Sequence, residues 1–149
     1  MRLRLAVQRE CRGQRLPGAA RISEWARAAL TGSGPGTAEV TVRLVDEAES
    51  AALNRRYRGK RGATNVLSFS YDRPRAAAGL AGDLVICAPV VARESAEQGK
   101  PLGTHWAHMV VHGIMHLRGY DHIHETDAQV MEALEIRILK RLGIPNPYA

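Results

Sequence analysis

The sequence contains only two cysteines, and they form no recognisable motif. Cys11 and Cys87 lie far apart without a C-x-x-C pair, so the sequence supports neither a disulfide framework nor a cysteine zinc site. Cys87 ends the apolar run 84–87, where a thiol usually behaves as a small hydrophobic side chain. The few cysteines thus exclude a small, disulfide-rich fold.

Long hydrophobic runs are also missing. No stretch approaches the run of about 20 apolar residues that a membrane-spanning helix needs. Residues 1–11 alternate apolar and charged side chains and contain no continuous hydrophobic core of the kind that a secretory signal carries. We therefore expect a cytoplasmic protein without a membrane partner, and an arginine-rich organellar presequence is the alternative.

Aromatic residues make up only 5% of the sequence, whereas basic residues are abundant. Lysine and arginine number 21 against 15 aspartates and glutamates, which gives a net charge of +6, and 18 of the 21 are arginine. Positive charge attracts polyanions, and the planar guanidinium suits phosphate, so the composition indicates nucleic acid. Biased codon usage would produce the same excess of arginine. The scarcity of aromatic rings argues against strong sequence-specific readout of bases by this chain alone.

The pattern of apolar residues predicts one domain over residues 1–149. Alternation with a period of two indicates strands at 3–7 and 40–44, and short apolar runs indicate two more at 66–69 and 83–87, the last after a turn at 79–82. Helical spacing indicates helices over 22–30, 46–55, 89–98, 104–117 and 126–142. The expected fold class is α+β: a single small mixed sheet of about four strands, covered by helices, one of them a histidine helix like that of zincins.

Three helix starts are assigned from capping signals. Asp46 begins a D-x-x-E capping box with Glu49, and a basic loop is expected after about residue 55. Thr104 and Thr126 are the N-caps expected for the last two helices. The buried stripe predicted for the final helix consists of Val130, Leu134, Ile138 and Leu142.

The most informative feature is a group of five histidines within residues 105–122. His112 and His116 are one helical turn apart on the same face, at the spacing that lets two imidazoles chelate one ion. Gly119 can end the helix and turn the chain, so that His122 supplies a third nitrogen. Three imidazoles suit Zn²⁺, and the lack of an obvious fourth protein ligand leaves a position for water, as in catalytic zinc sites.

The frame H-x-x-x-H-x-x-G-x-x-H is also that of the metzincin proteases, in which a glutamate follows the first histidine as general base. Here that position is Gly113. Because general base catalysis is typically worth about 10²–10⁴-fold, the missing carboxylate argues against peptide hydrolysis.

The segment 112–122 (HGIMHLRGYDH) is similar to the H-G-x-L-H-L-x-G-Y-D-H signature of the YbeY family of bacterial rRNA maturation endoribonucleases, and departs from it only at Met115. Residues 58–60 (RGK) with 64–69 (TNVLSF) resemble the family's R-G-K…T-[DN]-V-L-S-F, and residues 82–86 resemble its G-D-I strand. The resemblance covers about residues 53–149.

This resemblance implies a zinc-dependent endoribonuclease that prefers single strands. It implies a role in rRNA maturation, including processing of the 3′ end of 16S rRNA, and in quality control of the small ribosomal subunit. The implied partners are rRNA precursors and the small subunit or its assembly factors, with no preference for DNA. It also implies an arginine near the metal, which corresponds to Arg58.

In the mechanism that we expect, zinc stabilises charge on the phosphoryl oxygens and lowers the pKa of the nucleophile. Arg58 offers a bidentate fork to the charge that develops in the transition state, or belongs only to a solvated basic loop. Asp121 orients a ligand imidazole, acts as a proton relay or fixes the turn at the C-terminal end of the helix, and His108 is a candidate for supporting a ligand histidine. Four further basic residues are expected to bind flanking phosphates: Arg55, Arg56, Lys60 and Arg61.

Two alternatives remain open at this point. One is a ribosome-assembly factor that binds RNA and whose zinc is mainly structural. The other is a metal-dependent hydrolase of another phosphoester or of a peptide, against which the basic residues favour a polyanionic substrate.

Overall fold

The computed structural model describes residues 1–71 and 78–149. In chain order, the elements within these ranges are β1 (Arg2–Glu10), α1 (Ala19–Ala29), β2 (Thr37–Val45), α2 (Glu47–Arg58), β3 (Val66–Ser70), β4 (Gly79–Cys87), α3 (Ala88–Glu97), α4 (Leu102–Leu117) and α5 (Glu125–Arg141). The predicted α+β class is confirmed. Both cysteines are free, as the sequence indicates.

The strands form one mixed sheet in the order β1-β2-β4-β3. Strands β1, β2 and β4 run parallel, whereas β3 pairs antiparallel with β4. Leu3, Leu5 and Val7 of β1 alternate with exposed residues, so this edge strand has one covered face. At the opposite edge, β3 pairs with β4 and with no other strand among the described residues, and its other side borders a groove that is described below.

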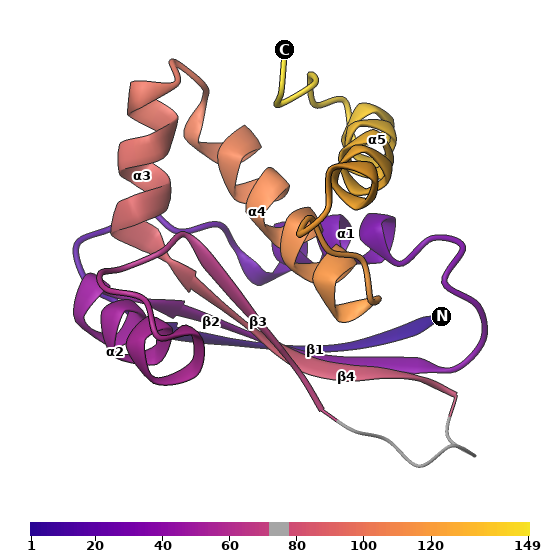
Figure 1. Cartoon of the computed structure of the whole chain (residues 1–149), viewed down its shortest axis with the longest axis horizontal. Helices are drawn as coiled ribbons and strands as arrows, with labels where there is room; N and C mark the ends of the chain where they lie inside the picture. Colours follow the sequence, from indigo (N-terminus) through magenta and orange to yellow (C-terminus); the bar gives the residue numbers. More distant parts are fainter. Residues whose placement is uncertain (72–77) are drawn as a thin grey trace.

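Helices cover the sheet unequally (Figure 1). Helices α1 and α4 pack on one face, where their apolar side chains join those of β2 and β4 in the larger core cluster. Helix α5 lies farther from the sheet, against α1 and α4 (Figure 1). Helix α2 covers only part of the opposite face, over a small cluster that includes Leu53, Leu67 and Val85. Helix α4 is therefore central, because it contacts α1, α3, α5, β3 and β4.

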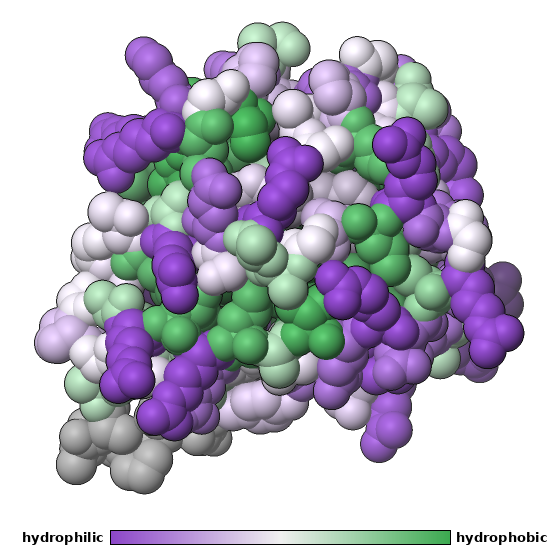
Figure 2. Space-filling model, turned by 180° about the vertical axis from the view of Figure 1, so that it is seen from behind, coloured by the Kyte–Doolittle hydropathy of each residue, from purple (hydrophilic) through white to green (hydrophobic). Residues whose placement is uncertain are grey.

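Hydrophobic side chains on the face seen from behind lie in separate groups between hydrophilic ones (Figure 2). In the part of the chain that the structure describes, no helix is both long enough and apolar enough to cross a lipid bilayer.

The predicted turn at residues 79–82 is wrong, because β4 already begins at Gly79. Gly79 pairs with Thr37 of β2, and a Cβ atom at Gly79 would lie 2.0 Å from the Thr37 carbonyl oxygen. Glycine serves here to let two backbones approach closely, which a sequence pattern does not distinguish from a turn.

The predicted helix starts are partly wrong. Helix α4 begins after Pro101, and the Thr104 hydroxyl donates a hydrogen bond to the Pro101 carbonyl oxygen at 2.8 Å. Helix α5 begins after His124, two residues before the position assigned. Asp46 does occupy the N-cap of α2, but its side chain makes no capping hydrogen bond. The Glu49 carboxylate pairs with Arg43 of β2, so the predicted capping box does not form.

The buried side of α5 also differs from the predicted stripe. It consists of Met131, Glu135, Ile138 and Leu139, whereas Val130 is 53% exposed. Ile138 is buried as predicted, and Leu134 and Leu142 are partly buried against the core, so the predicted stripe is wrong only at Val130. Positions spaced by four residues drift around a helix of 3.6 residues per turn, which places Val130 on the exposed side.

Gly113 lies where α4 packs tightly against the sheet. A Cβ atom there would lie 2.8 Å from Cδ2 of Leu84 and 3.3 Å from Cγ2 of Val66. Leu84 is fully buried, so it has little room to move. This packing gives a physical reason for the absence of a glutamate after the first ligand histidine.

We predict that Gly113→Ala destabilises the fold. Overpacking costs about 1–3 kcal/mol, and the better helix propensity of alanine recovers up to about 1 kcal/mol. The net loss in the free energy of unfolding should be about 1–2 kcal/mol, measured by urea titration. Gly103→Ala is the matched control in the same helix, since its Cβ would meet nothing closer than 3.5 Å. Equal stabilities of the two variants would contradict the packing argument.

Candidate metal centre

The end of α4 determines how the chain presents its histidines. His112 and His116 lie on the last two turns, and Gly119, with φ of +97°, ends the helix. The backbone N–H of Gly119 donates to the His116 carbonyl oxygen at 3.0 Å, and that of Tyr120 donates to the Met115 carbonyl oxygen at 3.1 Å. These are the two hydrogen bonds of a Schellman motif. The predicted helix exit at Gly119 is thus confirmed.

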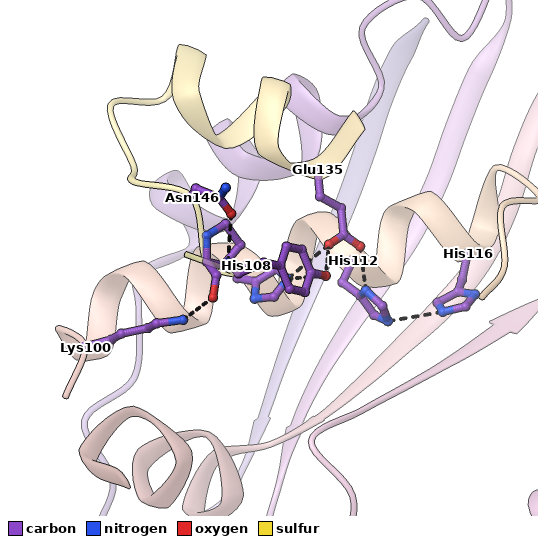
Figure 3. Close-up of polar contacts among 8 residues, drawn as sticks. Lys100, His108, His112, His116, Glu135 and Asn146 are labelled. Carbon is purple, nitrogen blue, oxygen red and sulfur yellow. Dashed lines mark hydrogen bonds and ion pairs between the residues drawn. The ribbon is translucent and has the colours of Figure 1, made fainter. Parts of the chain in front are cut away.

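This exit returns the chain so that three imidazoles converge. One ring nitrogen from each of His112, His116 and His122 lies within 4.8 Å of the other two. The Nε2 atoms of His112 and His116 are 3.2 Å apart (Figure 3). Two nitrogens bound at 2.0–2.1 Å to one tetrahedral ion would be roughly 3.3 Å apart, so this spacing fits a shared ion. The group therefore has the composition and geometry to hold a metal ion.

The surroundings of His116 keep its imidazole available as a ligand. Burial and the neighbouring rings of His112 and His122 lower the pKa of His116 to about 4. At neutral pH the His116 ring is consequently unprotonated, which is the state that binds a metal ion.

Glu135 of α5 supports the histidines from above (Figure 3). Its side chain is fully buried, and one carboxylate oxygen accepts a hydrogen bond from Nδ1 of His112 at 2.6 Å. The other oxygen contacts Nε2 of His108 at 3.0 Å and the hydroxyl of Tyr148 at 2.5 Å. Burial alone would raise the pKa of Glu135, but the hydrogen bonds from these three side chains outweigh it and lower the pKa to about 2.

The charge on Glu135 fixes the protonation pattern of His112. An ionised carboxylate can only accept hydrogen bonds, so Nδ1 of His112 must carry the proton. In the tautomer with the proton on Nδ1, the lone pair is on Nε2, the nitrogen that lies 3.2 Å from Nε2 of His116. A carboxylate that holds a ligand histidine in this way orients the ring and raises its basicity.

The C-terminal segment holds Tyr148 in place (Figure 3). The Lys100 ammonium donates to the Pro147 carbonyl oxygen, and the Asn146 side chain accepts a hydrogen bond from the Tyr148 backbone N–H at 2.8 Å. The Tyr148 ring lies edge-on to His108, with centroids 5.3 Å apart. The segment is thereby tied to the start of α4 and completes the hydrogen bonding of Glu135.

His108, His112 and Glu135 also form a group in which three ligand atoms lie within 4.8 Å of one another. We interpret this group as a hydrogen-bonded support rather than a second metal site, because both histidines already bond directly to the carboxylate. His105 lies apart from it, since its Nε2 atom is 2.8 Å from Glu94 of α3.

A groove of about 860 Å³ runs between the free edge of β3 and the histidines. Its floor includes Ser68, whose hydroxyl donates to the Gly113 carbonyl oxygen at 3.1 Å. The remaining lining comes from the end of α2, the loop before β3, β3 itself, α4 and the segment after α4. It includes Tyr57, Arg58, Asn65, Phe69, His112, His116, Tyr120, Asp121, His122 and Ile123. The three imidazoles thus face a space that is open to a large ligand.

The structure places the predicted basic residues in two settings. Helix α2 continues to Arg58, so Arg55, Arg56 and Arg58 lie on its last turn and not in a loop. Capping by Gly59 in the left-handed conformation explains why the helix extends beyond the predicted end. Arg58 lines the groove with the histidines. Arg55, Arg56, Lys60 and Arg61 are exposed around the same helix end and are not among the residues that line the groove.

Asp121 lines the groove, and its carboxylate accepts a hydrogen bond from the backbone N–H of Ile123 at 3.1 Å. It therefore stabilises the turn that carries His122, which is one of the three roles expected from the sequence.

Glu135 and Tyr148 are the site residues that the sequence analysis missed. Glu135 stands between Met131 and Leu139, four residues away on either side, and both of these residues are buried. A lone carboxylate within an apolar helix face is a signal of a buried, paired charge. Tyr148 offers no comparable pattern.

Together, fold and site define the class: a small α+β protein whose three-histidine centre lies in a groove beside an edge strand. The chain belongs to the family described as Endoribonuclease YbeY, which matches residues 13–143. The resemblance recognised in the histidine motif is thereby confirmed, and the relationship extends well before residue 53.

Curated relatives of that name support the assignment. The protein from Aromatoleum aromaticum is 57% identical over 151 residues, which cover 99% of this chain and 94% of the relative. The protein from Methylococcus capsulatus is 59% identical over 134 residues, covering 89% of this chain and 87% of the relative. A solution structure of a Thermotoga maritima protein matches with a TM-score of 0.56 and 22% identity, over 94% of this chain and 92% of that one, which shows a shared fold.

We predict that Glu135→Gln weakens metal binding about 10- to 100-fold. The amide of glutamine is neutral, so His112 loses the charged hydrogen-bond acceptor that orients its ring. Tyr148→Phe, which removes one hydrogen bond to Glu135, should have a smaller effect in the same direction. Competition with a chelator for Co²⁺ measures both affinities, and the visible spectrum of bound Co²⁺ reports a change in ligand geometry. Glu132→Gln, an exposed position on the same helix, is the control. Unchanged affinity in both test variants would refute the supporting role.

Proposed function

We propose that this protein is a zinc-dependent endoribonuclease that cuts single-stranded regions of rRNA precursors. The proposal includes maturation of the 3′ end of 16S rRNA, ribosome quality control, a cytoplasmic location, and association with the small ribosomal subunit or its assembly factors. The observation that carries it is the convergence of three histidine nitrogens in a groove that Arg58 also lines. Curated relatives named Endoribonuclease YbeY, at up to 59% identity, support RNA as the substrate.

Zinc fits the three histidines that we assign as ligands: His112, His116 and His122. Three neutral imidazoles form the donor set of several catalytic zinc sites, and they leave one position of the tetrahedron without a protein ligand. When bound, zinc supplies Lewis-acid stabilisation of the negative charge on phosphoryl oxygens. Glu135 and, through it, His108 keep the first ligand ring in the required tautomer.

Arg58 is the group that we assign to the reacting phosphate. Its position at the end of α2 directs a cation into the groove that the histidines face. The guanidinium can donate two parallel hydrogen bonds to a phosphate, and it stabilises the additional negative charge that develops in the transition state. A lysine ammonium cannot reproduce these two parallel hydrogen bonds.

The surrounding cations extend this electrostatic surface. Arg55, Arg56, Lys60 and Arg61 are exposed near the groove end where Arg58 lies. We assign them to phosphates on either side of the cleavage site, where they contribute affinity and little sequence preference. Asp121 acts on the site by fixing the turn that presents His122.

We predict that Arg58→Lys lowers the cleavage rate of an rRNA precursor at least about tenfold while the affinity for zinc is unchanged. His116→Ala should abolish both. Gel analysis of cleavage products, with and without a chelator, measures the first quantity, and metal titration measures the second. Arg27→Lys, on the exposed side of α1, is the control that tests whether any exchange of an exposed arginine for lysine lowers the cleavage rate. If rRNA processing fails with His116→Ala but proceeds normally with Arg58→Ala, the metal is structural and the assembly-factor alternative holds.

A second prediction concerns ionic strength. Each phosphate neutralised by a basic side chain releases counterions, so the affinity for single-stranded RNA should fall as salt rises, with a slope of about −0.7 per phosphate on a log–log plot. Replacing both Arg55 and Arg56 with glutamine should reduce that slope by about 1–2 while leaving the zinc content unchanged. Fluorescence anisotropy at four salt concentrations measures the slope. An identical slope in the double variant would exclude these side chains from the RNA path.

A further inference from the structure

Two aromatic side chains lie at the end of the groove where α2 meets β3. Tyr57 and Phe69 both line the groove, and their ring centroids are 5.1 Å apart in an edge-to-face arrangement. The Tyr57 residue is 56% exposed. By contrast, both tryptophans of the chain are buried, at 3% exposure for Trp25 and 2% for Trp106. The Tyr57 ring is therefore an exposed aromatic surface inside the groove of the candidate metal centre.

Packing of the fold does not account for the Tyr57 ring. The cluster beneath α2 consists of buried residues of the sheet and α3 with Leu53, Ala63 and Phe69 against them, and Tyr57 is not part of it. Tyr57 instead contacts the edge of that cluster through Phe69, and Arg56 lies over its ring at 5.3 Å from the centroid. A large ring in this position leaves apolar surface in water that a ligand can cover.

We propose that Tyr57, braced by Phe69, is a stacking platform for an unpaired RNA base. The proposal rests on the function proposed above and adds a binding subsite to it. Cations on the last turn of α2 flank the ring, because Arg56 lies over it and Arg58 follows it along the groove. An RNA strand whose phosphate lies at the histidines can therefore place a neighbouring base on Tyr57 while its backbone remains among cations.

This platform supplies a physical reason for a preference for single strands. A base within a duplex is covered on both faces by its neighbours, whereas an unpaired base can exchange that stacking for an aromatic side chain. Stacking tolerates every base, because each one has a π face. A single platform thus favours unpaired RNA without distinguishing one base from another. This fits a sequence with few aromatic residues, from which little base-specific recognition is expected.

Tyr71 provides a matched control on the same side of the molecule. It is also 56% exposed, but it lies by a different hollow, with Arg4 and Thr41 on the open face of the sheet. Its hydroxyl donates a hydrogen bond to Asp83. Exchange of Tyr71 therefore removes an equally exposed ring that does not line the groove.

The first test compares steady-state kinetics of the zinc-loaded full chain on single-stranded oligoadenylate. Tyr57→Ala should raise KM about 5- to 100-fold with kcat nearly unchanged, because stacking contributes to the binding of the flanking base. Tyr57→Phe should restore KM, since the ring and not the hydroxyl stacks. Tyr71→Ala should behave as the unsubstituted protein. Equal effects of Tyr57→Ala and Tyr71→Ala, or a loss confined to kcat, would overturn the platform.

The second test follows the stacking contact directly. In Tyr57→Trp, the emission of the exposed indole should be quenched when single-stranded oligoadenylate saturates the protein, while the buried Trp25 and Trp106 give a constant background. A duplex of the same length should not quench it. Saturation without quenching overturns the platform and leaves the proposed nuclease function intact. If the unsubstituted protein neither binds nor cleaves the RNA, both proposals fail together.

Discussion

A fully buried carboxylate is the constraint on which this arrangement depends. Glu135 lies among apolar residues on the inner side of α5, where an unpaired charge would cost several kcal/mol. The charge is retained because three side chains donate to it, two from α4 and one from the C-terminal segment. Satisfying this one group therefore fixes how α5 and the segment around Tyr148 dock on α4. The same contacts orient His112, so stability and site geometry share one set of hydrogen bonds.

The opposite side of α4 is constrained by packing rather than by charge. Gly113 lies directly above Leu84 and Val66, and this close approach holds the helix against β3 and β4. The groove exists because β3 is an edge strand whose outer side faces the end of this helix. Hence one helix connects the core, the buried carboxylate and the open groove, and His112 contacts both the carboxylate and the groove.

Sequence reasoning succeeded where a signal is local. The spacing of His112 and His116, the exit at Gly119 and the alternation in β1 each depend on residues a few positions apart, and the structure shows the helix, exit and strand that these patterns predict. Sequence reasoning failed where the same local pattern is compatible with two different backbone conformations. Glycines near residue 79 indicate a turn as readily as a close strand pairing, and threonines near a helix start need not cap it.

The sequence by itself determined the mixed α+β class, the cationic character and the family, because periodicity, charge and the histidine motif are all written in consecutive residues. Only the tertiary structure decided what surrounds the histidines. The contacts of Glu135 with His112 and of Tyr148 with His108 span 23 and 40 positions, and Arg58 reaches the groove from a separate helix. Such partners are selected by the packing of α2, α4, α5 and the C-terminal segment on one another and on the sheet, and no spacing along the chain encodes them.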